Sequence, residues 1–533
     1  MQENHNISAA FLRSAEIHAD RLFYSDRGVD ITYRAMGDKV ARLASFLSAA
    51  GRPRRVGILA TRSAEAYAGI LAAGLAGAAY VPLNLKWPEA RIVALLDMLE
   101  LDALVVDVNG AALLTPAVLR AAPARIVIAD AAGEVQGEGR HIVRLGEIDS
   151  EPLGKPAFVA ADEPAYVIFT SGTTGMPKGV MISAGSLRSY LDQSRGWTGL
   201  TPDDRLAETC DVTFDLSVHN LFLCVEAGAS LHVLTALEML APGRFVRSRG
   251  LTVWMSVPTL IAMMRRSGAL KPGMFPSLRL SIFCGEPLPA AAAQGWAQAA
   301  PNGVVENIYG PTEATVVCLR RRFTGDDALT PGRAIVAIGT PYETMEVAIL
   351  DARQRPVADG TPGEIALAGP QLAIGYLGEP ELTADRFRQI DGRRWYLTGD
   401  LGMRDAAGTF HHLGRTDNQI KVKGNRIELE EVETHLRRAA RTDMVAVVGW
   451  PVVDGAAQGL VGFCDSTLPP ENIAAAMATT LPRYMVPNPI HILTTLPVNI
   501  NGTVDRRALR ARLDEAGGEP GPPARAAQPA GAQ

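Results

Sequence analysis

The sequence predicts an α/β protein with a large N-terminal domain of doubly wound sheets, a small β-barrel subdomain and a small α+β domain at the C-terminus. At 533 residues the chain is too long to fold around one ordinary hydrophobic core, which predicts more than one domain. Apolar runs typical of buried strands alternate with helical segments, which indicates largely parallel sheets covered on both faces. From about residue 337 the pattern changes to short strands separated by Gly and Pro turns.

The predicted elements follow this alternation along the chain. Strands are expected at 56–60, 78–81, 103–106 and 125–128, with helices at 64–74 and 88–99, and the strand pattern returns at 231–234, 278–283 and 304–308. Residues 337–375 are expected to form the barrel, 414–424 to cross between domains and 426–509 to form the C-terminal domain. We therefore divide the chain into domains 1–415 and 416–515 and a tail, 516–533, whose Gly, Pro and Ala content predicts disorder.

The composition is typical of a soluble globular protein, with 47% hydrophobic and 20% charged residues. A formal net charge of −5 argues against nucleic acid or an anionic membrane as the main partner. The longest apolar run, 68–83, contains Gly and Pro, and the N-terminus lacks the features of a signal peptide. The five cysteines have no CxxC spacing, so we expect a reduced, cytoplasmic protein without structural zinc.

One loop carries the strongest chemical signal. The apolar run 166–169 leads into small hydroxyl residues and glycines followed by one lysine, and such a loop can close its N–H groups, hydroxyls and ammonium around phosphate oxygens. It is not a Walker A loop, because Pro177 replaces the glycine before the lysine and Gly179 stands where Ser or Thr would bind magnesium. The predicted phosphate-binding residues are Thr170, Ser171, Gly172, Thr173 and Lys178.

The string from Thr170 to Gly179, TSGTTGMPKG, resembles the phosphate loop of the adenylate-forming superfamily, which includes acyl-CoA synthetases, luciferases and nonribosomal-peptide adenylation domains. The resemblance extends from about residue 31 to 509, and further motifs follow in the expected order. It implies ATP and Mg²⁺ as cofactors. It also implies a mobile C-terminal domain that swings about Asp417, so that one cleft serves two successive steps.

The nucleotide site follows from two of these motifs, 307–313 and 396–400. An aromatic face at Tyr309 can stack on a purine, and the carboxylate of Glu313 can hold magnesium against phosphate oxygens. By resemblance, Asn307 faces the adenine, and Asp400 binds the ribose hydroxyls beside Arg415. The further residues expected around ATP are Gly285, Glu286, Gly310, Pro311 and Thr312. In isolation, each of these short motifs could also be an ordinary turn.

Asp215 points to an amino-acid substrate. In the amino-acid-activating branch, an aspartate at this position pairs with the substrate ammonium, and a buried carboxylate is costly unless a cation neutralises it. The alternative is a helix N-cap, because the segment that follows is expected to be helical. Transfer of the remaining pocket positions gives Leu216, His219, Met255, Ile282, Cys284, Ile308, Val316 and Val317. This lining is apolar apart from His219, which predicts a small or aliphatic substrate.

Two strings, 283–289 and 310–316, resemble the D-alanine–carrier-protein ligases. In those enzymes the residue matching Cys284 crowds the Cα substituent, although a buried, inert thiol is the simpler interpretation of this cysteine. We therefore expect D-alanine first, with glycine and L-alanine behind it. No carrier or condensation motif accompanies the domain, so the expected partner is a separate phosphopantetheinylated carrier protein. Lys421, Lys423 and Gly424 fall where the family faces the cleft during transfer, or form a solvated basic stretch.

One position departs from the family. The closing motif normally carries a lysine that bridges the substrate carboxylate and the α-phosphate, and here Thr503 occupies that position. Losing one preorganised stabiliser costs on the order of 100- to 1,000-fold in rate. Three hypotheses remain: an engineered substitution, a natural one in which Arg506, Arg507 or a partner supplies the charge, and a poor adenylator that mainly binds nucleotide.

The predicted function is therefore ATP-dependent activation of a small amino acid and its transfer to a carrier-protein thiol. An acyl-CoA synthetase for a small carboxylic acid is the alternative enzyme. A non-catalytic nucleotide-binding protein is the alternative from a different class.

Overall fold

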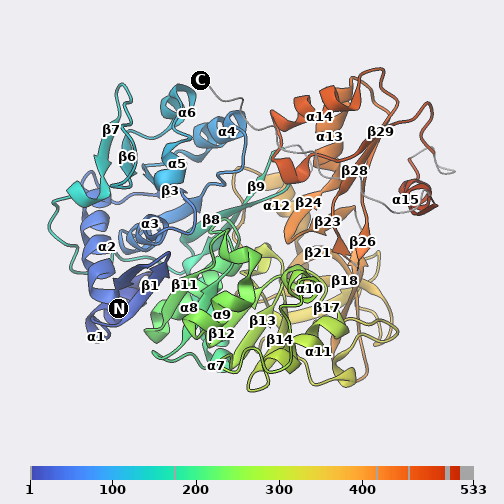
Figure 1. Cartoon of the computed structure of the whole chain (residues 1–533), viewed down its shortest axis with the longest axis horizontal. Coiled ribbons are helices and arrows are strands. Elements are labelled where there is room, and N and C mark those ends of the chain that lie inside the picture. Colours follow the sequence, from blue (N-terminus) through green and yellow to red (C-terminus); the bar gives the residue numbers. More distant parts are fainter. Residues whose placement is uncertain (1–2, 173–175, 416–417, 454–455, 498–503, 516–533) are drawn as a thin grey trace.

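The computed structural model describes residues 3–172, 176–415, 418–453, 456–497 and 504–515. Figure 1 shows two sheet-and-helix layers from the first two thirds of the chain, a β-rich part beneath them and the C-terminal part at their side. The predicted α/β class is thus confirmed. The tail expected to be disordered, the hinge Asp417, and Thr173 and Thr503 lie outside the described residues.

The first sheet has eight strands in the order β19-β9-β8-β4-β3-β5-β6-β7. Its strands are β3 (Arg55–Leu59), β4 (Ala79–Pro82), β5 (Ala103–Val106), β6 (Arg125–Ile128), β7 (His141–Arg144), β8 (Pro164–Thr170), β9 (Lys178–Ser183) and β19 (Gly375–Tyr376). The strands from β4 to β7 pair in parallel, as the alternating pattern predicts. The helices between them are α3 (Ala64–Leu75), α4 (Glu89–Leu99), α5 (Val108–Ala111) and α6 (Pro116–Ala121).

The second sheet has nine strands in the order β16-β15-β14-β13-β12-β10-β11-β1-β2. Its strands are β1 (Leu22–Asp26), β2 (Val29–Thr32), β10 (Arg205–Glu208), β11 (Ser230–Val233), β12 (Val253–Ser256), β13 (Leu280–Phe283), β14 (Val304–Tyr309), β15 (Leu319–Arg322) and β16 (Thr340–Pro341). Its helices are α1 (Ala9–Ile17), α2 (Tyr33–Ser48), α7 (Ala184–Thr198), α8 (Leu216–Ala227), α9 (Pro242–Arg249), α10 (Pro258–Arg266) and α11 (Ala290–Ala299). The parallel strands β12, β13 and β14 lie side by side in its middle.

The core of the N-terminal part lies between these two sheets. Helices α3 and α8 are buried nearly all round, which fits their almost uniformly apolar sequences. One hydrophobic cluster joins Ile58 of the first sheet and Leu231 of the second through Leu71 and Phe222 on these helices. Helix α8 is thus held rigidly, and Asp215 precedes its first turn as the N-cap residue.

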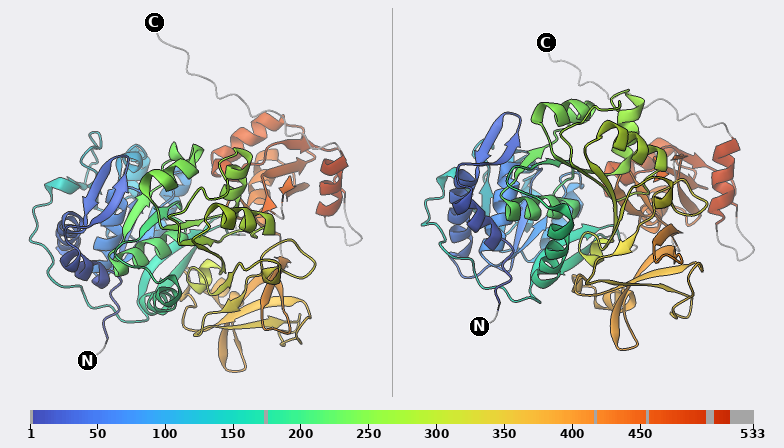
Figure 2. Two further views of the ribbon diagram at one scale, coloured as in Figure 1. Left: turned by 60° about the horizontal axis from the view of Figure 1, so that its bottom comes forward. Right: turned by 90° about the horizontal axis from the view of Figure 1, so that it is seen from below.

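The segment predicted as a small barrel forms a five-stranded antiparallel sheet. It comprises β17 (Glu346–Leu350), β18 (Gly363–Ala368), β20 (Phe387–Ile390), β21 (Arg393–Arg404) and β22 (Phe410–Arg415), with α12 (Pro380–Arg386) beside it. The sheet therefore continues well beyond residue 375. Figure 2 shows it as a separate layer below the two large sheets. Its strands β21 and β22 pair Asp400 with Arg415.

The C-terminal part has its own small core, which includes Ile427, Leu436 and Ile473. Its strands are β23 (Gln419–Val422), β24 (Asn425–Glu428), β25 (Val445–Gly449), β26 (Val452–Val453), β27 (Ala456–Ala457), β28 (Leu460–Cys464) and β29 (Ile490–Ile492), and its helices are α13 (Leu429–Ala440), α14 (Pro470–Ala478) and α15 (Arg506–Glu515). Strands β23 and β24 form a hairpin that points back toward the N-terminal sheets. Within the described ranges, no helix is long and apolar enough to cross a membrane.

Candidate active site

The predicted phosphate loop joins the antiparallel strands β8 and β9, whose register places Thr170 opposite Lys178. A Cβ at Gly172 would lie 2.1 Å from the carbonyl oxygen of Met176, so this close backbone approach admits only glycine. The Thr170 hydroxyl is buried and has no hydrogen-bond partner among the described residues. Such an orphaned donor and a side-chain-free backbone fit a phosphate ligand.

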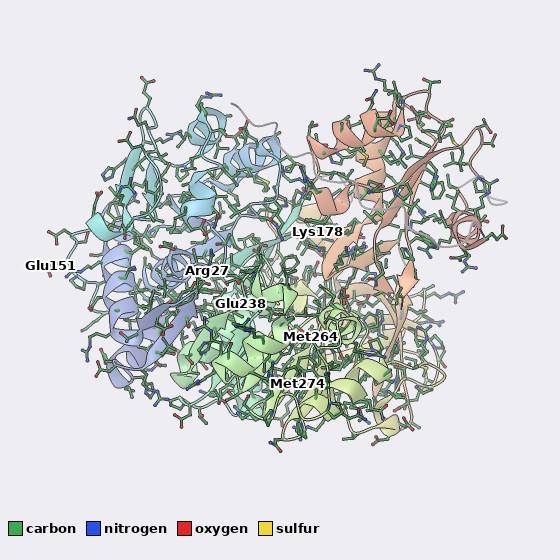
Figure 3. All side chains as sticks on the ribbon, in the orientation of Figure 1. Arg27, Glu151, Lys178, Glu238, Met264 and Met274 are labelled. Atoms are coloured by element: carbon green, nitrogen blue, oxygen red, sulfur yellow. The ribbon has the colours of Figure 1, made fainter. Side chains whose placement is uncertain are left out.

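Lys178, at the start of β9, lies where the N-terminal sheets meet the C-terminal part of the chain (Figure 3). Its Nζ is 3.4 Å from Oε1 of Glu428 and 5.4 Å from the centroid of the Tyr376 ring. Burial lowers the pKa of the Lys178 ammonium below its ordinary value. The lysine is therefore close to the loop but paired with a carboxylate from β24.

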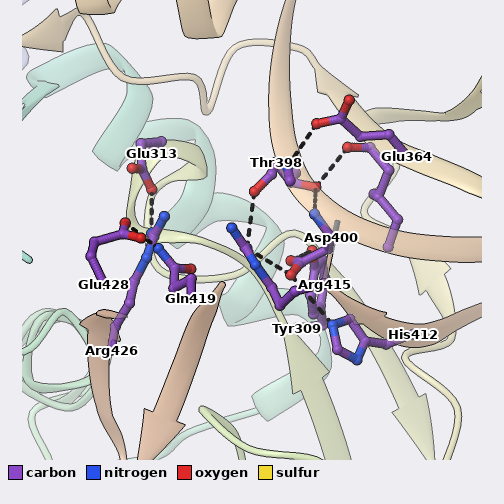
Figure 4. Close-up of polar contacts among 12 residues, drawn as sticks. Tyr309, Glu313, Glu364, Thr398, Asp400, His412, Arg415, Gln419, Arg426 and Glu428 are labelled. Carbon is purple, nitrogen blue, oxygen red and sulfur yellow. Dashed lines mark hydrogen bonds and ion pairs between the residues drawn. The ribbon is translucent and has the colours of Figure 1, made fainter. Parts of the chain in front are cut away.

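Glu313 lies in a 3₁₀ turn directly after β14 and is fully buried. Its carboxylate accepts hydrogen bonds from the Tyr376 hydroxyl at 2.8 Å and from Nη1 of Arg426 at 2.9 Å. Burial by itself would raise the pKa of this carboxyl, but the cationic Arg426 and Lys178 lower it to about 2. The group stays ionised, as a magnesium ligand must, and in this arrangement an arginine supplies its counter-charge (Figure 4).

The predicted ribose site centres on Asp400 in β21. Nη1 of Arg415 donates to its Oδ1 at 2.8 Å, Nε2 of His412 lies 3.3 Å from the same oxygen, and the Tyr309 hydroxyl donates to Oδ2. Burial would raise the pKa of the Asp400 carboxyl, but hydrogen bonding to His412 and the positive charge of Arg415 hold it well below its usual range. The structure thus brings together Tyr309, Asp400 and Arg415, and adds His412, which the motifs did not indicate (Figure 4).

The residues expected around adenine lie at the end of β14 and in the turn that follows it. Asn307 is buried and donates from Nδ2 to the carbonyl oxygen of Ala337 at 2.8 Å. A Cβ at Gly310 would lie 2.3 Å from Cα of Val317, so a close backbone approach explains this glycine. Pro311 and Thr312 lead from this turn into the Glu313 turn. These expected nucleotide residues therefore lie together at the carboxyl end of β14.

Both carboxylate oxygens of Glu286 accept hydrogen bonds from other residues of the protein. Its Oε2 accepts hydrogen bonds from the backbone N–H and the hydroxyl of Thr259, at 2.9 and 2.6 Å. Its Oε1 accepts the backbone N–H of Gly424, from the β23–β24 hairpin, at 2.8 Å. Gly285 beside it has φ +89°, a conformation that favours glycine. In this arrangement Glu286 links the N-terminal part to the C-terminal hairpin.

Asp215 is the N-cap residue of α8, but its side chain makes no capping hydrogen bond. Asp215 therefore precedes the helix without capping it, and its carboxylate is hydrogen-bonded to Thr312 instead. Burial raises the pKa of the Asp215 carboxyl to about 6, although a hydrogen bond to Thr312 and the charge of Lys421 act in the opposite direction. A partly buried carboxylate whose charged form is disfavoured in this way is suited to a cationic ligand.

The predicted pocket lining comes from α8, β12, β13, β14 and the turn that carries Val316 and Val317. Met255 on β12 is opposite Ile282 on β13, and the period of two places Cys284 and Ile308 on the same face. His219 lies four residues after Asp215, one turn farther along the same face of α8. All eight transferred lining residues are buried: Leu216, His219, Met255, Ile282, Cys284, Ile308, Val316 and Val317.

Val316 is presented by a strained turn. Thr315 and Val316 have φ values of +55° and +67°, which β-branched residues rarely adopt. Gln371 holds the turn, because its carbonyl oxygen accepts the Thr315 hydroxyl at 2.5 Å and its Nε2 donates to the carbonyl oxygen of Val317 at 2.9 Å. Gln371 was not among the predicted site residues, and a buried glutamine distant in sequence gives no local signal of such a role.

The C-terminal part docks onto these same groups. The backbone N–H of Gly172 donates to Oε2 of Glu431 at 3.1 Å, and the backbone N–H of Glu428 donates to Oγ of Ser171 at 3.2 Å. Glu431 also pairs with Arg91 on α4, and both side chains are buried. The β23–β24 hairpin therefore lies against the predicted nucleotide site through Gly424 and Glu428, whereas the side chains of Lys421 and Lys423 are exposed.

Arg506, one of the residues considered as a substitute for the missing lysine, has a partner inside the C-terminal part. Its Nη2 donates to both carboxylate oxygens of Glu433, at 2.7 and 2.9 Å. Glu433 is 3% exposed and also accepts the backbone N–H of Val447 at 2.9 Å. In this arrangement Arg506 forms an ion pair that links α15 to α13.

Comparison with known proteins shows which family the chain is similar to. Residues 11–377 match the family model described as AMP-binding enzyme. The chain is 34% identical over 522 residues to phosphinothricin tripeptide synthetase PhsC of Streptomyces viridochromogenes, a match that covers 95% of the chain but 45% of that protein. It is 30% identical over 526 residues to the D-alanine–D-alanyl carrier protein ligase of Lacticaseibacillus rhamnosus, with 96% of the chain and 99% of the ligase covered.

The chain is also similar to a solved structure of an adenylation domain. The Vibrio cholerae adenylation domain AlmE, in complex with glycyl-adenosine-5'-phosphate, superposes with a TM-score of 0.88 at 32% identity. The match covers 97% of this chain and 99% of AlmE. By contrast, the chain spans 7% of tyrocidine synthase 3 of Brevibacillus parabrevis, to which it is 33% identical over 501 residues. The similarity thus extends over a single adenylation unit.

Proposed function

Since the chain belongs to the family of AMP-binding enzymes and is an adenylate-forming ligase, we propose that it activates a small amino acid with ATP and passes it to the phosphopantetheine thiol of a carrier protein. The observation that carries the proposal is Asp215. This carboxylate is partly buried at the start of α8, directly before the predicted lining residues Leu216 and His219, and no helix N–H neutralises it by capping. An amino-acid ammonium would supply the missing positive charge.

The first step joins the amino acid to AMP. A carboxylate oxygen of the amino acid attacks the α-phosphorus, a new P–O bond forms, and the bond to pyrophosphate breaks. The Thr170 hydroxyl, the Gly172 N–H and Lys178 would bind phosphate oxygens, while Asp400 would hold the ribose. Magnesium, held by Glu313 when Arg426 is elsewhere, would shield the phosphate charge.

The second step transfers the aminoacyl group. The thiol gives its proton to solvent, its sulfur attacks the acyl carbon, the thioester forms, and AMP leaves with the electron pair of the broken C–O bond. The contacts of Gly424 with Glu286 and of Arg426 with Glu313 support a transfer arrangement for the structure described here. They bring the hairpin to the cleft at the same groups that adenylation needs.

D-Alanine remains the favoured substrate, with glycine as its direct competitor. The pocket lining is apolar and buried, so it offers no charge to a long polar side chain. A ligase similar over its whole length is named for D-alanine, and a similar solved structure contains glycyl-adenylate. Both similarities support an amino acid with at most a methyl group on Cα.

The test is amino-acid-dependent exchange of pyrophosphate into ATP over a panel containing glycine, both alanines, 2-aminobutyrate and valine. The parent chain and Thr503→Lys are assayed side by side, with Asp215→Asn as the isosteric variant that removes only the charge. We expect exchange with one small amino acid and its loss in Asp215→Asn. Thioester formation from simple acids and CoA without any amino-acid response would instead establish an acyl-CoA synthetase. Nucleotide binding without exchange in either chain would establish a binding protein.

A further inference from the structure

Four aromatic rings meet around His219, one of the residues predicted to line the amino-acid pocket. Tyr190 and Trp197 lie on α7, His219 lies on α8 and Tyr342 follows β16. The Tyr190 hydroxyl is hydrogen-bonded to Nδ1 of His219 at 2.5 Å, and the Trp197 ring stacks on His219 with centroids 6.0 Å apart. Of the four, only His219 belongs to the positions transferred from sequence.

Tyr342 completes this aromatic cluster. Its hydroxyl accepts a hydrogen bond from Nε1 of Trp197 at 3.2 Å, and its ring stacks on Tyr190 with centroids 6.4 Å apart. Tyr190 is fully buried, and His219 and Tyr342 are 2% and 5% exposed. Each ring is thus fixed by at least two others, and none can rotate without displacing a neighbour.

The cluster is electrically neutral at its centre. Burial lowers the pKa of His219 to about 3, so its imidazole is uncharged at neutral pH. A neutral ring beside Asp215 does not compete with a substrate ammonium for the carboxylate. The imidazole therefore adds no charge to this part of the predicted pocket.

Tyr190 is the member that connects the cluster to the pocket. Its hydroxyl lies close enough to Cys284 and Asp215 for both to contribute to raising its pKa, after the larger effect of burial. It also holds the His219 ring, which lies one helical turn below Asp215. Tyr190 and His219 therefore form two interlocked rings next to residues predicted to line the pocket.

We propose that Tyr190 determines substrate size: it fills the base of the pocket and locks His219 as a wall that admits hydrogen or methyl on Cα and excludes larger groups. This inference rests on the proposed function. It assigns specificity to a residue outside the transferred lining. A rigid wall is needed because one extra methylene in an adaptable apolar pocket changes discrimination by only about 10- to 200-fold.

The test measures binding of non-hydrolysable aminoacyl-adenylate analogues, in which a sulfamate replaces the phosphate, so that the result does not depend on Thr503. The probes carry glycyl, alanyl, 2-aminobutyryl and valyl groups, and a matched series carries acetyl, propionyl and butyryl groups without the ammonium. The variants are Tyr190→Phe, which removes the hydroxyl, and Tyr190→Leu, which also opens the ring space. Tyr33→Phe is the control, because it removes another buried hydroxyl, one bonded to the carbonyl oxygens of Cys224 and Ala229.

We expect the affinity for the 2-aminobutyryl probe relative to the glycyl probe to rise about 10-fold in Tyr190→Leu and by a smaller factor in Tyr190→Phe. Tyr33→Phe should keep the parent ratio. An unchanged ratio in both Tyr190 variants, with melting temperatures showing that they are folded, would overturn the proposal. If the parent binds propionyl as tightly as alanyl, the proposed function fails, and the size limit is then read from the acyl series. A shifted limit in that series would still support the role of Tyr190.

Discussion

Nη1 of Arg426, on β24, donates a hydrogen bond at 2.9 Å to Oε2 of Glu313, the carboxylate that the sequence assigns to magnesium. The two side chains come from parts of the chain 113 residues apart and are both largely shielded from water. A cation from the protein thus stands where a metal ion is expected during adenylation. Because the Glu313 carboxylate cannot bind Arg426 and a magnesium ion equally well at the same time, docking of the hairpin and metal binding should oppose each other.

The first prediction concerns this ion pair. Arg426→Gln should leave pyrophosphate exchange within about threefold of the parent, yet slow transfer to a thiol by about 10- to 100-fold, because the docked arrangement loses a buried charge pair worth a few kcal/mol. Single-turnover transfer to a phosphopantetheine thiol measures the second rate. Arg437→Gln is the matched control, since Arg437 is 41% exposed and pairs with Glu433 at 3.8 Å. Equal losses in both half-reactions would contradict the prediction.

The second prediction concerns the phosphate loop. Carboxylates of Glu428 and Glu431 contact Lys178 and the Gly172 N–H, so they occupy groups expected to bind phosphate oxygens. Added pyrophosphate with magnesium should therefore displace the C-terminal part, as measured by energy transfer between dyes on the two parts of the chain.

Glu431→Gln should lower the docked fraction without any ligand, because the buried ion pair between Arg91 and Glu431 is lost. Glu430→Gln is the control, since Glu430 accepts a hydrogen bond from Asn418 within the C-terminal part. A docked fraction that does not respond to pyrophosphate would refute the competition.

The third prediction is a pH dependence of amino-acid binding. Burial raises the pKa of Asp215 to about 6, so its carboxyl becomes neutral as the pH falls below that value. Attraction for an ammonium then disappears, and the amino-acid KM should rise about tenfold per pH unit below 6 while the ATP KM stays nearly constant. Asp215→Asn should bind weakly at every pH and lose this dependence. An amino-acid KM that is flat between pH 5 and 7 in the parent would show that Asp215 does not bind the ammonium.

The fourth prediction concerns the strained turn. Gln371→Ala removes the group that donates to the carbonyl oxygens of Ala314 and Val317, and unsatisfied buried groups cost about 1–3 kcal/mol each. The melting temperature should fall, and the amino-acid KM should rise more than the ATP KM, because Val316 loses its fixed position. Gln193→Ala is the control, since it removes one hydrogen bond near the surface, from the Glu343 N–H. A loss of stability without any change in amino-acid KM would limit Gln371 to a structural role.

Much of the site could be predicted because its chemistry is local. The close backbone approach at Gly172, the turn before Glu313 and the helical spacing from Asp215 to His219 each depend on neighbours within a few residues. Strand and helix positions in the N-terminal sheets were predicted to within a few residues for the same reason, since periodicity and turn residues act over short distances. The extent of the sheet after 375 was not predicted: β21 pairs with its neighbours β20 and β22 and also with β18, which lies earlier in the chain.

The sequence by itself determined the family, the order of the nucleotide motifs and the choice of Asp215 as the candidate partner of an amino group. Only the tertiary structure decided that Arg426 pairs with Glu313, that Gln371 supports the turn at Val316, and that Tyr190 and Tyr342 meet beside His219. These contacts join elements separated by tens to hundreds of residues. No local pattern encodes them, because they form only when the sheets and helices pack against one another.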